Sequence, residues 1–261
     1  MIIKLLFFVF IPQSGINMNF NYIDKEYINL LKNIQNYFYA SQNSIHKARN
    51  EIKIIDFNGE SLVVKSFKTP NIINKIIYTF FRDSKAKKSY ENSMKIFDFV
   101  PKPIGYIEFH KFGLIDDSYF VSEKFDYDFT IREPLRDYNF ENKKEIFEAF
   151  AQFTFELHEN NIFHLDYSLG NILIKKDDGS YIFKVVDINR MEFKKLSVDE
   201  RLKNFSKLWA KDADLKVIIN EYAKLIKSDT DYCVKIALKY SQAHKDRKNL
   251  KKRLRGQQVV D

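Results

Sequence analysis

Cysteine is almost absent from this sequence of 261 residues, in which Cys233 stands alone. A single cysteine excludes an intramolecular disulfide and any metal site built from several cysteines. This composition agrees with a reducing compartment such as the cytosol. We therefore interpret Cys233 as a buried structural thiol.

The apolar run at the start of the chain is too short to span a bilayer. Residues 1–11 are apolar apart from Lys4, but a helix that spans a bilayer needs about 20 apolar residues. This stretch could be the core of a signal peptide, because Lys4 precedes the apolar run and Ser14-Gly15 follows it. We favour the other interpretation, in which residues 1–17 are an over-extended start, since Met18 lies directly before residues of globular composition.

The remaining composition is that of a folded, basic protein. Hydrophobic residues make up 45% of the chain and aromatic residues 16%, which is enough for a packed interior. The formal net charge of +8 points to anionic partners: nucleotide, nucleic acid, phospholipid or phosphorylated glycan. No internal repeat and no low-complexity linker is evident.

The first half of the chain combines strands with a few helices. Asn58-Gly59 joins two runs rich in Ile and Val and suits a two-residue hairpin turn. The spacing of apolar residues predicts helices at 25–38, 72–81 and 84–97, and strands at 50–57, 61–67, 104–109 and 118–123. Together these elements predict a small sheet accompanied by a long helix.

The second half is mainly helical. Ile146, Phe150, Phe153 and Leu157 recur at helical spacing within residues 141–159. Further helices are expected at 197–208 and 215–240, and a second hairpin at 172–174 and 181–186 around Asp177-Asp178-Gly179. The sequence thus predicts an α+β fold.

Residues 164–173 carry the clearest chemical pattern. They follow the long helix and lead into a strand, so Asp166 and Asn171 are expected in an exposed loop. Asp166 can accept a proton from a hydroxyl group, and Asn171 offers an amide oxygen of the kind that binds Mg²⁺. Antiparallel pairing in the second hairpin places Asn171 opposite Val186 or Asp187. A carboxylate and an amide oxygen should therefore meet at one end of the hairpin.

This pattern resembles a known catalytic loop. His164-x-Asp166-x₄-Asn171, followed by a hairpin and Val185-Val186-Asp187, is similar to the catalytic loop and metal-binding aspartate of protein-kinase-like enzymes. The match is closer to the bacterial lipopolysaccharide kinases, the Kdo and heptose kinases, because Asp187-Ile188-Asn189-Arg190 stands in place of Asp-Phe-Gly. The resemblance covers roughly residues 47–209.

The resemblance implies a protein-kinase-like fold with a sheet-rich N-lobe at residues 18–124, a mainly helical C-lobe at 125–244 and a basic tail at 245–261. It also implies that ATP and Mg²⁺ are the cofactors. Asp166 would be the catalytic residue, Asn171 and Asp187 would bind the metal, and His164 would support the loop by hydrogen bonding.

The N-lobe would supply the nucleotide contacts. By resemblance, Lys65 holds the α- and β-phosphates and Glu91 on the following helix is its ion-pair partner. The adenine is expected to dock on the backbone near Glu123 to Phe125.

Two features depart from the protein-kinase pattern. Residues 41–49 contain no glycine where a glycine-rich loop would cover the phosphates. Lys47 or Arg49 could supply charge there, and a solvated basic strand is the alternative. No Ala-Pro-Glu motif follows Asp187. The stretch after Arg190 is expected to run quickly into a helix, which leaves little room for a peptide-binding segment and disfavours protein substrates.

The leading hypothesis is an ATP- and Mg²⁺-dependent kinase that phosphorylates a sugar hydroxyl of lipopolysaccharide core or Kdo. The alternatives are a small-molecule phosphotransferase of the aminoglycoside or choline type and a non-catalytic kinase-like binding module. A nucleic-acid partner is not expected, since no helix-turn-helix or RNA-binding signature occurs. We expect a cytoplasmic location, because ATP is scarce outside the cytosol.

The C-terminal basic stretch has two interpretations. Between Lys245 and Arg255 the basic residues are opposed only by Asp246. The stretch could be a frayed, solvated tail, or an electrostatic anchor to the anionic inner membrane, where each basic residue can contribute about 1 kcal/mol. A lipid-linked glycan substrate would be consistent with the second interpretation.

Overall fold

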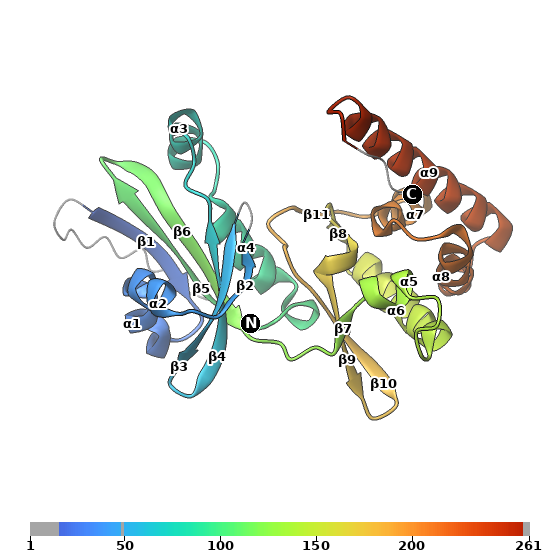
Figure 1. Cartoon of the computed structure of the whole chain (residues 1–261), viewed down its shortest axis with the longest axis horizontal. Coiled ribbons are helices and arrows are strands. Elements are labelled where there is room, and N and C mark those ends of the chain that lie inside the picture. Colours follow the sequence, from blue (N-terminus) through green and yellow to red (C-terminus); the bar gives the residue numbers. More distant parts are fainter. Residues whose placement is uncertain (1–15, 48–49, 258–261) are drawn as a thin grey trace. The chain divides into compact units, whose positions relative to one another are not determined.

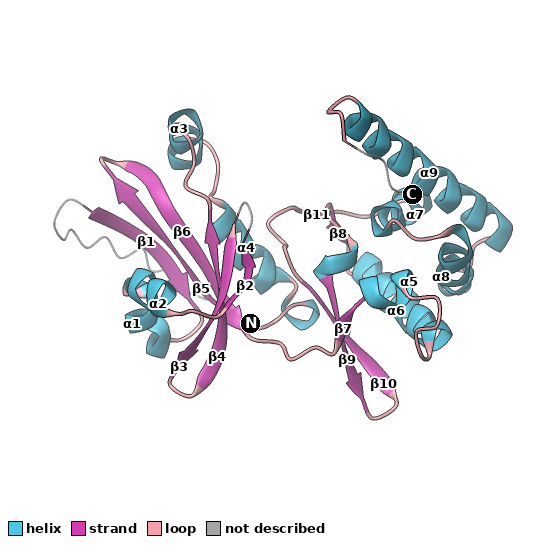
Figure 2. Ribbon diagram, viewed as in Figure 1, coloured by secondary structure: helices cyan, strands magenta, loops and turns pink. Residues whose placement is uncertain are grey.

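The computed structural model describes residues 16–47 and 50–257 (Figure 1). The chain divides into two compact units, Met1–Phe125 and Asp126–Asp261. The first is rich in strands and the second in helices (Figure 2).

The first unit is built on an antiparallel sheet with strand order β1-β5-β6-β4-β3-β2. Its strands are β1 (Ile16–Tyr22), β2 (Ser44–Lys47), β3 (Glu51–Phe57), β4 (Glu60–Phe67), β5 (Pro103–Lys111) and β6 (Leu114–Glu123). β1 begins inside the segment that we expected to precede the lobe, and it pairs with β5 so that Ile16 lies opposite Lys111. Asn58 and Gly59 have positive φ angles of 53° and 84°, which confirms the predicted two-residue turn between β3 and β4.

Helices cover the sheet from different sides. α1 (Ile28–Lys32) and α2 (Ile34–Ala40) bury Leu30, Leu31, Ile34 and Phe38 in a core with Leu62 and Val64 of β4. A continuous helix was expected at 25–38, and this prediction was wrong: Lys25–Tyr27 form a 3₁₀ helix, and the α-helical part is divided at Asn33. The Asn33 side chain donates a hydrogen bond to the carbonyl of Asn29 and so competes with the helical backbone.

The other helices of this unit are α3 (Ile72–Phe80) and α4 (Lys85–Lys95). Asn71 and Ser84 cap their first turns by accepting hydrogen bonds from backbone N–H groups. α4 packs against β4, β5 and β6. Its residues Ala86 and Tyr90 form a second core with Phe67 and Tyr106.

The second unit contains α5 (Arg132–Arg136), α6 (Lys143–Glu159), α7 (Val198–Asn204), a 3₁₀ helix (Phe205–Leu208), α8 (Asp212–Leu225) and α9 (Thr230–Arg253). Its short strands form two sheets, β10-β9-β7 and β11-β8. They are β7 (Phe129–Thr130), β8 (Ile162–His164), β9 (Ile172–Asp177), β10 (Ser180–Val185) and β11 (Met191–Phe193). The predicted long helix and second hairpin are confirmed as α6 and β9–β10.

The helical region expected at 215–240 consists of two helices, because the chain turns after α8. Lys227 has a positive φ of 51°, and Asp229 caps α9 by accepting a hydrogen bond from the N–H of Tyr232. Cys233 is fully buried, as predicted. α9 continues to Arg253, so residues 245–253 of the basic stretch are helical. No helix in the described ranges combines the length and apolar character needed to cross a bilayer.

Candidate active site

The loop between β8 and β9 holds Asp166 and Asn171 in a tight set of hydrogen bonds. The N–H of Ser168 donates to the carbonyl of Asp166 at 2.7 Å, and the N–H of Asn171 donates to the carbonyl of Ser168 at 2.9 Å. The Asn171 side chain closes the loop, because its Nδ2 donates to the carbonyl of Asp166 at 2.8 Å. This bond uses the amide nitrogen, and the amide oxygen is the atom of Asn171 that can act as a metal ligand.

Tyr167 fixes the loop from the protein interior. Its ring is fully buried and stacks on Phe150 of α6 at 5.8 Å between centroids. Its hydroxyl lies 2.8 Å from the Thr154 hydroxyl, which is also buried. This anchor holds the middle of the loop against α6.

His164 connects the loop to the segment that carries Asp187. Its Nδ1 accepts a hydrogen bond from the N–H of Asp166, and its Nε2 donates one to the carbonyl of Val186, both at 3.0 Å. These two bonds require the neutral tautomer with the proton on Nε2. Burial lowers the pKa of the imidazole and stabilises that neutral form. The predicted supporting role of His164 is confirmed.

The β9–β10 register brings Asn171 and Asp187 to the same end of the hairpin. Ile172 lies opposite Val185, and the N–H of Val186 donates to the carbonyl of Asn171 at 3.0 Å. Asn171 is therefore opposite Val186, which confirms the predicted register. Asp187 follows directly, and its carboxylate accepts a hydrogen bond from Asn189 at 2.7 Å.

Asp187 has a left-handed backbone conformation with φ of 57°. A non-glycine residue in this region costs on the order of 1–3 kcal/mol and is held there by its surroundings, most often at functional sites. Asp and Asn tolerate the conformation better than most residues. The backbone thus turns sharply at the residue whose carboxylate is the candidate metal ligand.

A buried chain of hydrogen bonds supports His164 from behind. The hydroxyl of Tyr222 on α8 donates to His158 Nδ1 at 2.6 Å, and His158 Nε2 donates to Asn204 Oδ1 at 3.1 Å. Asn204 Nδ2 donates in turn to the carbonyl of His164 at 3.0 Å. This chain joins α8, α6 and α7 to the catalytic loop. This hydrogen-bonded chain could not be predicted from the sequence, because its residues lie far apart along the chain and show no periodic pattern.

In the first unit, Lys65 lies on β4 and Glu91 on α4. Lys65 shares a face of the sheet with Phe67, its Nζ is 5.3 Å from the centre of the Phe67 ring, and Phe67 packs against Ala86 and Tyr90 of α4. Glu91 forms an ion pair with Lys87 at 3.8 Å. The Lys65–Glu91 ion pair itself stays a prediction.

The expected adenine contact lies at the end of β6. The N–H of Glu123 donates to the carbonyl of Lys102 at 2.9 Å, and the Glu123 carboxylate pairs with the Lys102 ammonium at 2.6 Å. The role of Glu123 and Phe125 in binding adenine stays a prediction. Lys47 ends β2 and lies 3.9 Å from Glu51, while Arg49 falls outside the described residues.

Asn171 and Asp187 fit the chemistry of a magnesium site. Mg²⁺ prefers oxygen ligands and is usually held by one or two protein groups together with waters and substrate phosphates. Among the described residues no cluster of three or more His, Cys, Asp or Glu side chains could hold a metal alone. The Asn171 amide oxygen and the Asp187 carboxylate, at one end of the hairpin, would supply two oxygen ligands to a nucleotide-bound Mg²⁺.

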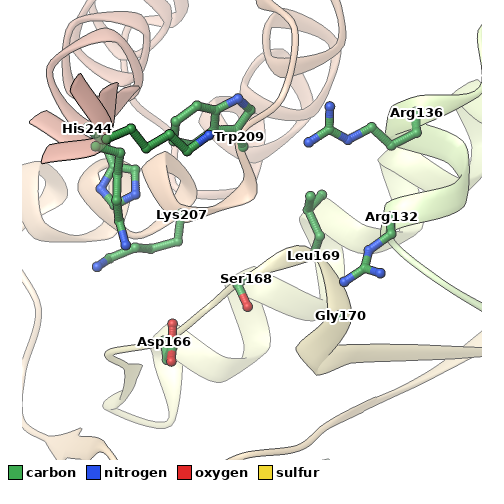
Figure 3. Close-up of a pocket in the computed structure, with 11 residues that line it drawn as sticks. Arg132, Arg136, Asp166, Ser168, Leu169, Gly170, Lys207, Trp209 and His244 are labelled. Carbon is green, nitrogen blue, oxygen red and sulfur yellow. The ribbon is translucent and has the colours of Figure 1, made fainter. Parts of the chain in front are cut away.

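A pocket of about 480 Å³ opens beside Asp166 within the second unit (Figure 3). Its walls are strongly basic, and its cations come from three elements. The lining residues are Arg132, Arg136, Asp166, Ser168, Leu169, Gly170, Lys207, Trp209, His244, Lys248 and Lys252. The basic lining residues were not predicted as parts of a site.

Comparison with known proteins supports the fold but gives no sequence family. No family model matches the sequence, and no curated protein matches it significantly. A solved structure of WaaP in complex with acyl carrier protein is similar, with a TM-score of 0.57 and 12% identity over 89% of this chain and 98% of that chain. The fold is protein-kinase-like. The predicted α+β fold class is confirmed.

A second solved structure is the Rio2 kinase–ADP/Mg²⁺–phosphoaspartate complex from Chaetomium thermophilum. It matches with a TM-score of 0.45 and 16% identity, over 81% of this chain and 66% of that chain.

The buried histidine behind the loop predicts a pH dependence of stability. Burial lowers the pKa of His158 from 6.5 to about 4, so the unfolded chain binds a proton below pH 6.5 that the folded unit does not. The neutral His158 should therefore contribute fully to the free energy of unfolding above pH 6.5. Between pH 6.5 and 4 the free energy of unfolding should fall by up to about 1.4 kcal/mol per pH unit. Trp209, the single tryptophan, reports on this unit in fluorescence-monitored urea unfolding.

His158→Gln keeps a hydrogen-bond donor but cannot take up the proton, so its unfolding free energy should depend less on pH. His46→Gln, at an exposed position of β2, is the matched control and should keep the wild-type dependence. If the free energy of unfolding had the same pH dependence in wild type and in His158→Gln, the dependence could not be assigned to His158.

Proposed function

We propose that this protein transfers the γ-phosphoryl group of ATP to a hydroxyl group of a lipopolysaccharide sugar, in the core or in Kdo. The observation that carries the proposal is the position of Asp166, Asn171 and Asp187 in a protein-kinase-like fold. His164 ties the backbone at residue 166 to that at residue 186, and the hairpin register sets Asn171 next to Asp187. A carboxylate that accepts the hydroxyl proton, and an amide with a second carboxylate that bind the metal, are the groups that phosphoryl transfer needs, which supports the proposal.

The proposed reaction needs little covalent chemistry from the protein. The acceptor oxygen forms a bond to the γ-phosphorus, and the bond from that phosphorus to the β–γ bridging oxygen breaks, so its electron pair leaves with ADP. Asp166 accepts the proton of the acceptor hydroxyl and later releases it to solvent. Lys65 would hold the α- and β-phosphates. A Mg²⁺ ion held by Asn171 and Asp187 would neutralise charge on the phosphates when bound.

The segment after Asp187 supports a non-protein acceptor. Directly after Arg190, β11 pairs with β8 so that Met191 lies opposite His164, and α7 begins at Val198. A peptide-binding activation segment has no room in so short a connection. Asp187-Ile188-Asn189-Arg190 and the similarity of fold to WaaP favour a lipopolysaccharide sugar over a small-molecule acceptor of the aminoglycoside or choline type.

Asp166→Asn tests the catalytic base. The variant keeps the size of the side chain and the backbone hydrogen bonds of residue 166 but cannot accept the proton, so phosphate transfer from labelled ATP to purified lipopolysaccharide should fall about 100-fold or more. The Kd for ATP with magnesium should change less than about twofold, since Asp166 contacts the acceptor and not the nucleotide. Transfer at the wild-type rate would contradict the assigned role.

Magnesium dependence tests the two proposed metal ligands. ATP should raise the Tm of the wild-type protein much more with magnesium than without, and Asp187→Asn should remove most of that difference. The Asn substitution keeps a side chain that tolerates the left-handed backbone. Asp178→Asn, in the turn at the opposite end of the hairpin, is the control and should behave as wild type. Equal stabilisation of the wild type with and without magnesium would favour a non-catalytic binding module.

A further inference from the structure

The C-terminal helix α9 forms one wall of the pocket beside Asp166. His244, Lys248 and Lys252 recur at every fourth position and therefore share one face of the helix, and all three line the pocket. Two contacts hold this face in place. The Lys252 ammonium lies 5.7 Å from the centre of the Trp209 ring, and His244 contacts the same ring at 6.1 Å between centroids.

The pocket has a second basic wall on α5. Arg132 and Arg136 stand on one side and Lys207 with His244 on the other, while Ser168 and Leu169 lie between them (Figure 3). Arg132 approaches the catalytic loop so closely that a Cβ atom on Gly170 would lie 2.8 Å from its guanidinium. Gly170 thus leaves space for the Arg132 side chain against the catalytic loop.

These positive charges are not neutralised by the protein. None of Arg132, Arg136, Lys207, Lys248 and Lys252 forms an ion pair within the described part of the chain, and Asp166 is the single carboxylate among the lining residues. The nearby positive charges also lower the pKa values of two lining residues. Burial, with Lys207, Lys248 and Arg247 nearby, lowers the pKa of His244 to about 4. Burial also lowers the pKa of Lys207, and Arg247 and Lys248 add to that effect.

We propose that this pocket binds an acceptor that carries two anionic groups, phosphate or carboxylate, in addition to the reacting hydroxyl. The proposal rests on the proposed function and specifies its substrate class. Arg132 and Arg136 would hold one anionic group, and Lys207, Lys248 and Lys252 would hold another. The reacting hydroxyl would then be directed toward Asp166, which lines the same pocket.

Charge balance favours this occupant over a neutral sugar. A neutral acceptor would leave five cations close together in a partly enclosed space, whereas two anionic groups compensate them through charge-assisted hydrogen bonds. The planar guanidinium groups on α5 suit bidentate contacts with phosphate or carboxylate. The same arrangement explains why the basic C-terminal stretch is folded against the catalytic unit as far as Lys252.

The test compares two double variants of α9 that lose the same charge. Lys248→Gln/Lys252→Gln removes the pocket lysines, and Lys251→Gln/Arg253→Gln removes two exposed cations of the same helix that do not line the pocket. Calorimetric titration of the full-length protein would use fructose 1,6-bisphosphate, the dicarboxylate glucarate, and neutral fructose as probes. Thermal unfolding of both variants checks that they fold.

We expect fructose 1,6-bisphosphate to bind wild type at least about tenfold more tightly than fructose. The pocket variant should weaken its binding by about tenfold or more, and the control variant by less than about twofold. Tighter binding of glucarate than of the bisphosphate would assign the pocket to carboxylate groups, and the reverse to phosphate groups. Lys65→Met should retain bisphosphate binding, which separates this pocket from the nucleotide phosphate site.

Three outcomes would overturn the proposal. One is equal bisphosphate affinity in wild type and the pocket variant, and another is an equal loss in both double variants, which would indicate general surface charge. The third is unchanged bisphosphate affinity together with an equal loss of binding to anionic vesicles in both double variants, which would assign α9 to a membrane surface. The proposed kinase activity is judged separately by Asp166-dependent transfer, so anion binding without transfer would retain the pocket and refute the activity.

Discussion

The candidate active site depends most on one side chain, the buried imidazole of His164. Its two ring nitrogens join the N–H of Asp166 to the carbonyl of Val186, so the loop that carries the proposed base and the segment that carries the proposed metal ligand are held together. The imidazole can make both bonds only while it is neutral, and burial keeps it neutral. Behind it, Asn204, His158 and Tyr222 extend the same hydrogen-bonded chain through the helices of the second unit.

Local features of the fold could be predicted from the sequence, and long-range features could not. The β9–β10 hairpin and its register follow from Asp178-Gly179 and the alternating residues beside it, and α6 follows from its apolar spacing. β1 was not foreseen, because its partner strand begins only at Pro103. The interruption of the first helix depends on one hydrogen bond of the Asn33 side chain, which no periodicity reveals.

In the candidate site, too, the residues brought together locally could be predicted, and those brought together over long range could not. Asp166, Asn171 and Asp187 could be identified because a short loop and a hairpin bring them together. The basic pocket could not, since Arg132 and Lys252 are separated by most of the second unit and meet only after α9 has packed on α7 and α8. In the sequence the basic stretch resembles a tail or a membrane anchor. In the structure one face of it lines the pocket beside Asp166.

The central claim is that this chain phosphorylates a lipopolysaccharide sugar with Asp166 as the base. Mass spectrometry of lipopolysaccharide from cells that lack the gene, complemented with either the wild-type or the Asp166→Asn gene, tests it most directly. We expect the glycan to lose the mass of one phosphate group in the deletion strain and in the Asp166→Asn strain, and to regain it with the wild-type gene. Identical phosphate content in all strains would contradict it.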